Sequence, residues 1–413
     1  MVLLYRFALF IYRILIGIAA PFNTKARKWV AGRKNIFLKL QRALAPQIDY
    51  VWFHFPSLGE FEQGRPVLEA YREQWPETSV IVTFFSPSGY EYRKDYAHAD
   101  HVFYLPMDGP RNAKRLLDLF HPKAVFFTKY DYWYYYFRAC YRRNIPLYMI
   151  SCVFQPRQIF FKWYGGFFRR ILRYVTHFFV QNQRSLQLLQ RIGLEQASVS
   201  GDTRFDRVLQ VREQRRALPL IDQFTSRGST PALVAGSTWP KDIEQLKAFH
   251  EHFPVYTLII APHEISPSHI KEIQLQFPEA VLFSRLSDKG ESRNTSRVLI
   301  IDNIGMLSSL YAYARIAYIG GGFGAGIHNI LEAATYGVPV IFGPNYHKFE
   351  EAGELIDKGG AFSISQQEEL LEICRKLMHP NFMTEAGNQA RIYVETRAGA
   401  SKHIIDFLKA AQH

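Results

Sequence analysis

The chain has 413 residues, of which 48% are hydrophobic and 21% are charged, and its formal net charge is +13. This length suits two domains of about 150 to 200 residues each, and the apolar content is sufficient to bury a core in both. The three cysteines, Cys140, Cys152 and Cys374, have no paired spacing. They therefore suggest neither a disulfide framework nor a Cys-based metal site.

The basic side chains gather in the N-terminal half. Residues 1–48 carry nine Lys and Arg residues and no acid, and residues 132–194 carry ten more, again without an acid. The basic residues of these two tracts outnumber the net positive charges of the whole chain, so the rest of the chain has a small net negative charge. No zinc-finger, helix-turn-helix, KH or RNP signature accompanies them, and we therefore expect no nucleic-acid partner.

Residues 1–22 are predicted to form a membrane-anchor helix. Met1 to Ala20 is mostly apolar and leads directly into a Lys/Arg cluster, a pattern typical of attachment to an anionic membrane surface. Arg6 and Arg13 lie seven residues apart and so on nearly the same helical face. This favours an interfacial amphipathic helix, or a short span with snorkelling arginines, over a cleaved signal. A helix docked on the protein itself is the third alternative.

Residues 40–206 alternate apolar, strand-like runs with segments of helical spacing. This pattern predicts a parallel sheet with helices on both faces, and thus a Rossmann-like domain. The candidate strands are Val51–Phe55, Ser79–Phe84, His101–Leu105, Ala124–Thr128, Pro146–Ser151 and His177–Gln181.

Residues 207–230 are polar and charge-rich, and we interpret them as a helix followed by an interdomain linker. The β/α pattern then restarts over residues 231–396, and a closing helix is expected within residues 397–413. The sequence therefore predicts an α/β protein with two Rossmann-like domains, whose ligands bind at the carboxyl ends of the strands. The candidate strands of the second domain are Ala232–Ala235, Thr257–Ala261, Val281–Ser284, Val298–Ile301, Arg315–Ile319 and Pro339–Phe342.

The most informative stretch runs from Gly320 to Glu332, between the strand that ends at Ile319 and a helix predicted over Asn329 to Tyr336. Glycines let the backbone approach a ligand, and the N–H groups of a helix start attract a phosphate. His328, Asn329 and Glu332 fall on one side of the first helical turns, and a carboxylate there can accept two ribose hydroxyls. Such a turn can also serve only to pack a helix on a sheet.

The run from His328 to Pro344 resembles the nucleotide-binding segment of the 3-deoxy-manno-octulosonic acid (Kdo) transferases, which are GT-B enzymes. Four further segments match motifs of that family in the same order, so the resemblance covers nearly the whole chain. They are Phe53–Glu60 (H-x-x-S-x-G-E), Thr83–Gly89 (T-x-T-P-T-G), Ser200–Asp206 and Ala235–Thr238.

The resemblance implies a GT-B fold with two Rossmann-like domains facing a central cleft and a C-terminal helix that crosses back to the first domain. It also implies an inverting glycosyltransferase that moves Kdo from CMP-Kdo to the lipid A precursor, lipid IVA, at the cytoplasmic face of the inner membrane. No cofactor is expected. Two rival interpretations are another GT-B enzyme, such as a nucleotide-sugar epimerase or a different sugar transferase, and a non-catalytic protein that binds the membrane surface.

Within this resemblance Glu60 corresponds to the catalytic glutamate, and we predict it to be the general base. An acid in a first helical turn is otherwise often only a partner of the helix dipole. The expected acceptor contacts are Ser57, Gly59, Ser86, Ser88, Gly89 and Asp131. The expected donor and nucleotide contacts are Arg204, Ser237, Thr238, Pro262, His263, Gly321, Gly322, Gly324, Gly326, His328, Asn329 and Glu332.

Two departures from the family pattern affect these assignments. Asp131 stands where the family has the glutamate of an E-L-W motif, and Lys129 stands where the family has another glutamate. The acceptor contacts at this strand end can therefore differ from those of the family. No metal is expected, because no D-x-D motif follows a strand and His328 lacks ligand partners at a suitable spacing.

Overall fold

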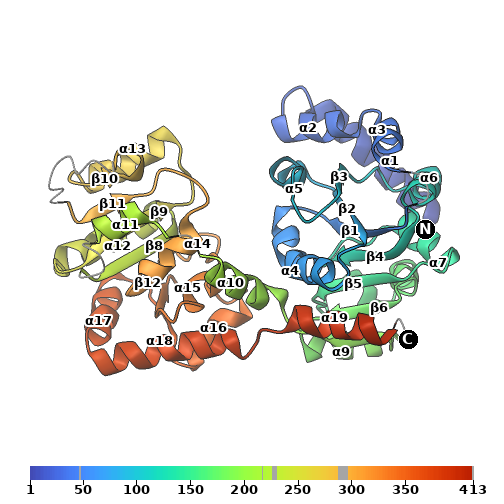
Figure 1. Cartoon of the computed structure of the whole chain (residues 1–413). Helices are drawn as coiled ribbons and strands as arrows, with labels where there is room; N and C mark the ends of the chain where they lie inside the picture. The colour runs from blue at the N-terminus through green and yellow to red at the C-terminus, as the bar shows by residue number, and fades with distance from the viewer. Residues whose placement is uncertain (46–47, 216, 226–229, 287–295, 412–413) are drawn as a thin grey trace. The chain divides into compact units, whose positions relative to one another are not determined.

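The computed structural model describes residues 1–413 except 46–47, 216, 226–229, 287–295 and 412–413. It divides into two compact units: unit 1 comprises Met1–Arg207 and Ala398–His413, and unit 2 comprises Val208–Arg397. Each unit contains a seven-stranded sheet in which every pair of neighbouring strands is parallel (Figure 1). The predicted α/β class with two Rossmann-like domains is confirmed.

The sheet of unit 1 has the order β3-β2-β1-β4-β5-β6-β7. Its strands are β1 (Tyr50–Phe55), β2 (Ser79–Phe84), β3 (His101–Tyr104), β4 (Pro122–Thr128), β5 (Leu147–Cys152), β6 (His177–Val180) and β7 (Ala197–Val199). The helices between them are α4 (Leu58–Gln74), α5 (Pro87–Arg93), α6 (Pro110–Phe120), α7 (Tyr134–Arg142), η1 (Ile159–Phe161), α8 (Gly166–Leu172) and α9 (Gln183–Gln190), and α10 (Thr203–Glu213) follows β7.

Helices cover both faces of this sheet, and the central strand β1 is buried along its whole length. Val51, Phe53 and Phe55 share a core with α4 and with the closing helix α19 (Ala400–Ala411), which packs on α4. Trp52 points the other way, into the core formed with α6 and α7. Because alternate strand residues face opposite sides, His54 shares the face of Trp52.

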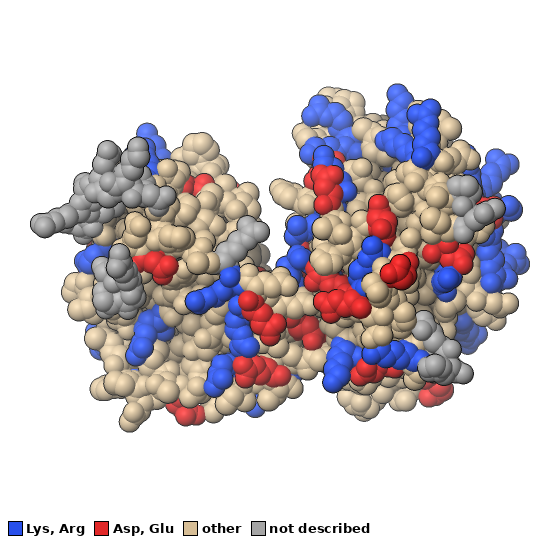
Figure 2. Space-filling model, in the orientation of Figure 1, with Lys and Arg blue, Asp and Glu red and all other residues tan. Residues whose placement is uncertain are grey.

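Three helices precede the sheet: α1 (Val2–Ala19), α2 (Thr24–Arg33) and α3 (Ile36–Ala43). Helix α1 is docked on its own unit, because Tyr5 Oη donates to Asp108 Oδ2 at 2.6 Å and Tyr12 packs edge-on against Trp29. None of its residues is buried, and Leu3 remains 78% exposed. By length and composition α1 could also cross a membrane. Lys and Arg side chains gather over α2 and α3 (Figure 2).

The sheet of unit 2 has the order β10-β11-β9-β8-β12-β13-β14. Its strands are β8 (Ala232–Thr238), β9 (Thr257–Pro262), β10 (Val281–Leu282), β11 (Val298–Ile300), β12 (Ile316–Ile319), β13 (Val340–Phe342) and β14 (Ala361–Ser363). The helices are α11 (Pro219–Phe224), α12 (Pro240–His252), α13 (Pro267–Gln276), η2 (Phe283–Arg285), α14 (Leu307–Leu310), η3 (Tyr311–Tyr313), α15 (Leu331–Ala334), α16 (Glu350–Asp357), α17 (Gln367–Leu377) and α18 (Pro380–Glu395).

Three differences from the sequence-based expectations concern local structure. The last strands of the two sheets, β7 and β14, were not predicted, because each has only three residues, too few to display a period. The helix expected over Asn329 to Tyr336 is limited to Leu331–Ala334, and Gly337 follows with a φ of 72°. The expected linker contains α11, while its residues 216 and 226–229 lie outside the described residues.

Candidate functional site

The predicted catalytic and acceptor residues lie in unit 1, where β1, β2 and β4 end. Ser57 follows β1 and caps α4, since its Oγ accepts from Gly59 N at 3.2 Å. The same hydroxyl donates to Glu60 Oε2, so the half-buried carboxylate is oriented from within its own helical turn.

The loop after β2 is joined to the loop after β1 through the backbone. Ser86 N donates to Pro56 O at 2.9 Å, and Ser86 Oγ caps α5 by accepting from Ser88 N. Gly89 is required by packing, because a Cβ built there would lie 2.1 Å from a ring carbon of Phe84. These contacts bring Ser57, Gly59, Glu60, Ser86, Ser88 and Gly89 together at one edge of the sheet.

Asp131, after β4, belongs to a hydrogen-bonded chain whose other three members were not among the predicted site residues. Its Oδ2 lies 2.7 Å from Nε2 of the fully buried His54, and His54 Nδ1 lies 2.8 Å from Thr83 Oγ1. Trp52 Nε1 donates to the same Thr83 hydroxyl at 2.7 Å. The indole can only donate, so one consistent arrangement has Thr83 donating to His54 Nδ1 and Nε2–H donating to Asp131. Asp131 is thereby oriented across the sheet edge.

Arg204 lies in unit 1, at the start of α10. Its Nε donates to Asp202 Oδ2 at 2.8 Å, and its backbone N–H donates to Asp202 Oδ1 at 2.9 Å. Asp202 is itself 9% exposed and therefore holds the guanidinium by a partly desolvated ion pair. Burial raises the pKa of Tyr130, and the nearby charge of Arg204 opposes part of that increase.

In unit 2 the glycine-rich loop between β12 and α15 encloses, together with the start of α12, a cavity of about 490 Å³. Close backbone packing explains the glycines: a Cβ at Gly320 would lie 2.3 Å from Ser237 O, and one at Gly322 would lie 2.6 Å from Gly343 N. Gly321 and Gly326 have φ values of 89° and 144°, which disfavour any other residue.

Asp242 anchors this loop, a role that the sequence did not reveal. Its Oδ2 accepts from Gly321 N at 2.9 Å and from Trp239 N at 2.8 Å, while Oδ1 accepts from Tyr318 Oη at 2.8 Å. Burial raises the pKa of Asp242, and the two backbone N–H groups counteract the increase. Asp242 stands three residues after Trp239, at the start of a helix that begins with proline, and this position predicts that its carboxylate caps the helix. It does not predict the hydrogen bond to Gly321, which lies 79 residues further along the chain.

The N–H groups of the loop are therefore less available to a phosphate than the sequence suggested. Gly321 N donates to Asp242, and Gly324 N and Gly326 N donate to Gly321 O at 2.9 and 3.2 Å. Helix α15, with four residues, is also too short to provide the predicted phosphate site at its N-terminus. The 13-residue helix α12 begins at the same cavity and carries Lys241 in its first turn. A cation and a helix N-terminus together favour an anion there.

Three rings stack beside this cavity. His263 lies 4.8 Å from Trp239 and 4.5 Å from His328, measured between ring centroids, and Trp239 Nε1 donates to His328 Nε2 at 3.2 Å. Burial and the neighbouring His263 lower the pKa of His328. Since Nε2 accepts from the indole, the proton of the neutral ring sits on Nδ1.

The remaining predicted residues of unit 2 have different surroundings. Asn329 Nδ2 donates to Glu332 Oε1 at 3.1 Å, which joins two of the predicted contacts, while His328 belongs to the ring stack. Ser237 adopts a φ of 53°, and the buried Thr238 Oγ1 has no hydrogen-bond partner among the residues that the structure describes. Pro262 ends β9 and positions His263. Within the described residues no group of three or more His, Cys, Asp or Glu side chains could hold a metal ion.

Residues 28–207 match the family model of 3-deoxy-D-manno-octulosonic-acid transferase (kdotransferase). The transferase of that name from Aquifex aeolicus is 26% identical over 336 residues, which is 79% of this chain and 86% of the relative. That of Chlamydia muridarum is 26% identical over 375 residues, covering 87% of this chain and 85% of the relative.

Among solved structures, the UDP-GlcNAc 2-epimerase of Neisseria meningitidis bound to UDP-GlcNAc aligns with a TM-score of 0.62. It is 16% identical and covers 87% of this chain and 100% of that chain. At this identity the similarity concerns the fold alone, and it supports the GT-B class. The family model matches most of unit 1, and the two relatives extend the similarity through 79% and 87% of the chain, so the protein is similar to the 3-deoxy-D-manno-octulosonic acid transferases over most of its length.

Proposed function

We propose that this enzyme transfers Kdo from CMP-Kdo to the lipid A precursor, lipid IVA, with inversion at the anomeric carbon. The observation that carries the proposal is the geometry of Glu60 in a chain similar to this family. Glu60 begins the helix that follows the central strand β1, and the Ser57 hydroxyl orients its carboxylate. A carboxylate held in this way can take a proton from an acceptor hydroxyl.

In the proposed reaction an acceptor hydroxyl oxygen attacks the anomeric carbon of Kdo while Glu60 takes the hydroxyl proton. The bond between that carbon and the phosphate oxygen breaks, and CMP leaves as an anion. No second acid is required, because the leaving phosphate is already a stabilised anion. Stabilising its developing charge is then the main remaining task.

Unit 2 is the proposed site for CMP. The N-terminus of α12 and Lys241 are suited to the phosphate, and Glu332, oriented by Asn329, is suited to the ribose hydroxyls. The stacked rings of Trp239, His263 and His328 offer an apolar wall beside the same cavity. Asp242 supports this site indirectly by holding the glycine-rich loop against α12.

Unit 1 is the proposed site for the acceptor at the cytoplasmic face of the inner membrane. Residues 24–43, which span α2 and α3, carry seven Lys and Arg residues, and these favour an anionic surface and a phosphorylated acceptor. Helix α1 leaves Leu3, Phe7 and Phe10 at least half exposed. Since Tyr5 and Tyr12 hold α1 against unit 1, we propose that it lies in the membrane interface and does not span the bilayer.

The proposal is tested by incubating the purified chain with CMP-Kdo and lipid IVA in neutral detergent, followed by measurement of CMP release and product mass. We expect CMP release that requires the acceptor, together with a product heavier by one or more Kdo units. The same chain incubated with UDP-GlcNAc provides the test of the epimerase alternative. Epimerisation of UDP-GlcNAc, or the absence of transfer by a folded chain, would contradict the proposal.

A further inference from the structure

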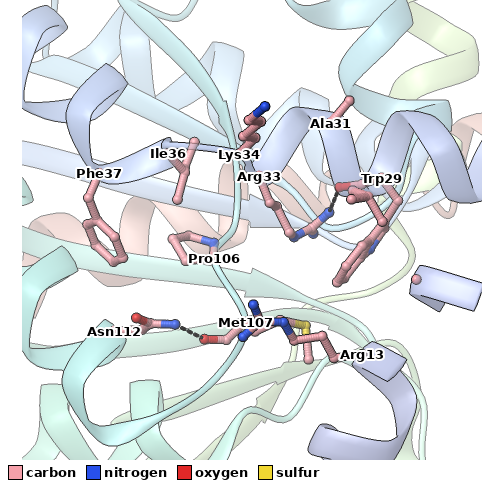
Figure 3. A pocket seen from close by; sticks show the side chains of 12 residues that line it. Arg13, Trp29, Ala31, Arg33, Lys34, Ile36, Phe37, Pro106, Met107 and Asn112 are labelled. Carbon is pink, nitrogen blue, oxygen red and sulfur yellow. Dashed lines mark hydrogen bonds between the residues drawn. The ribbon is translucent and has the colours of Figure 1, made fainter. Parts of the chain in front are cut away.

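A second cavity lies in unit 1 among the N-terminal helices, apart from the predicted catalytic residues. Its volume is about 420 Å³, within the range of small-molecule sites. Helices α1, α2 and α3 and the segment between β3 and α6 enclose it, and none of the predicted acceptor residues lines it. Figure 3 shows Arg13 extending from α1 alongside Met107, with Ile36, Phe37 and Pro106 forming the opposite wall.

The charged groups of this cavity all have the same sign. Arg13, Arg33 and Lys34 line it, and no carboxylate does among its lining residues. The Arg33 guanidinium lies 3.9 Å from the centroid of the Trp29 ring, and the acceptors it has among the described residues are carbonyl oxygens, including Phe85 O at 2.7 Å. Burial lowers the pKa of Arg33 to about 9. An anion near this cavity would compensate a charge that the protein itself leaves uncompensated.

Arg13 is the group best placed to meet such an anion. It is exposed, and within the described part of the chain its guanidinium has no ion-pair partner. In Figure 3 its guanidinium lies beside Met107, whereas the ammonium of Lys34 points away from Pro106. A guanidinium binds a phosphate through two parallel hydrogen bonds.

The rest of the lining is mainly apolar, which a small hydrophilic anion would not use. Trp29, Ile36, Phe37, Pro106 and Met107 offer a surface for hydrocarbon, and Asn112 directs its amide to Met107 O at 2.8 Å. Arg13 and Gly17 belong to α1, whose other side chains include the exposed Phe10 and Leu15. A membrane that receives α1 would therefore bring acyl chains to the rim of this cavity.

We propose that the cavity binds one anionic phospholipid of the membrane, with the lipid phosphate paired to Arg13 and the upper part of an acyl chain against Trp29, Ile36 and Phe37. The bound lipid fixes α1 on unit 1 in the orientation needed at the interface. This inference adds a specific lipid site to the proposed membrane association. The acceptor is not the occupant, because the predicted acceptor residues surround Glu60 and do not line this cavity.

Binding of soluble short-chain lipids to the full chain tests the proposal without a membrane. We expect dihexanoyl phosphatidylglycerol, below its micelle concentration, to bind by calorimetry at least tenfold more tightly than dihexanoyl phosphatidylcholine, because the choline cation opposes Arg13 and Arg33. Arg13→Gln should weaken binding of the anionic lipid about tenfold or more, and Arg13→Lys should weaken it less. Inorganic phosphate alone should bind far more weakly than the lipid.

Arg27→Gln is the matched control, because Arg27 is an exposed residue of α2 that does not line the cavity. Equal binding by Arg13→Gln and the parent chain, or equal losses in Arg13→Gln and Arg27→Gln, would overturn the proposal. A raised KM for lipid IVA in Arg13→Gln, measured in neutral detergent without phospholipid, would also overturn it by identifying the occupant as the acceptor. Failure of Kdo transfer with normal lipid binding would instead contradict only the proposed function.

Discussion

Replacing Asp242 with alanine should destabilise unit 2 and open its glycine-rich loop. The substitution removes the acceptor of three hydrogen bonds, those from Gly321 N, Trp239 N and Tyr318 Oη, at a side chain that is 1% exposed. Each buried donor left without an acceptor costs about 1–3 kcal/mol. The free energy of unfolding should therefore fall by at least about 3 kcal/mol. Asp242→Asn keeps an acceptor for the two N–H groups and should cost about 1–2 kcal/mol.

Urea unfolding and calorimetric titration with CMP give the two readouts. Asp242→Ala should weaken CMP binding as well as stability, because the loop loses its connection to α12. Tyr318→Phe is the control: it removes one hydrogen bond at a cost of about 1 kcal/mol but leaves Gly321 N bound to Asp242, so CMP affinity should be unchanged. Equal stability of Asp242→Ala and Asp242→Asn, with equal CMP affinity, would refute the proposed role of Asp242.

Three further predictions concern Asp108, Glu332 and the N-terminal helix. Burial raises the pKa of Asp108 to about 6. Between about pH 4 and pH 6 the folded state therefore holds a proton on Asp108 that the unfolded state has lost. The free energy of unfolding should decline as the pH rises through this range. Asp108→Asn should flatten that part of the curve of unfolding free energy against pH, and an unchanged slope would exclude Asp108 as its source. Glu332→Ala should cost about 1.5–3 kcal/mol of CMP binding, whereas normal affinity in a folded variant would leave Glu332 a structural role with Asn329. Deletion of residues 1–20 should reduce pelleting with anionic vesicles but preserve CMP binding by unit 2, and undiminished pelleting would contradict the anchor.

The sequence predicted the sheet cores well because their strands are long and apolar. β2 has the predicted bounds, Ser79–Phe84, and β1 extends the predicted strand by one residue. The three-residue strands β7 and β14 were missed because alternation cannot be recognised over so short a segment. The helix after the glycine-rich loop was predicted too long at both ends, since it was expected over Asn329 to Tyr336 and is limited to Leu331–Ala334.

The candidate site was predictable where a motif is local and was missed where partners are distant. Ser57 and Glu60 are three residues apart, and their hydrogen bond follows from helical geometry. The contact between His54 and Asp131 joins residues 77 apart, and that between Asp242 and Gly321 joins residues 79 apart. No periodicity in the sequence encodes such pairs. They arise because parallel strands bring distant loops to the same sheet edge.

The most direct test of the proposed mechanism is the turnover number of Glu60→Gln with CMP-Kdo and lipid IVA. Glutamine keeps the size of the side chain and can still accept from Ser57 Oγ, but it cannot take a proton. Glu73→Gln, at an exposed position of the same helix, is the matched control. We expect turnover to fall about 100- to 10,000-fold in Glu60→Gln, with CMP affinity unchanged and the control unaffected. Near-normal turnover by Glu60→Gln would contradict its role as the general base.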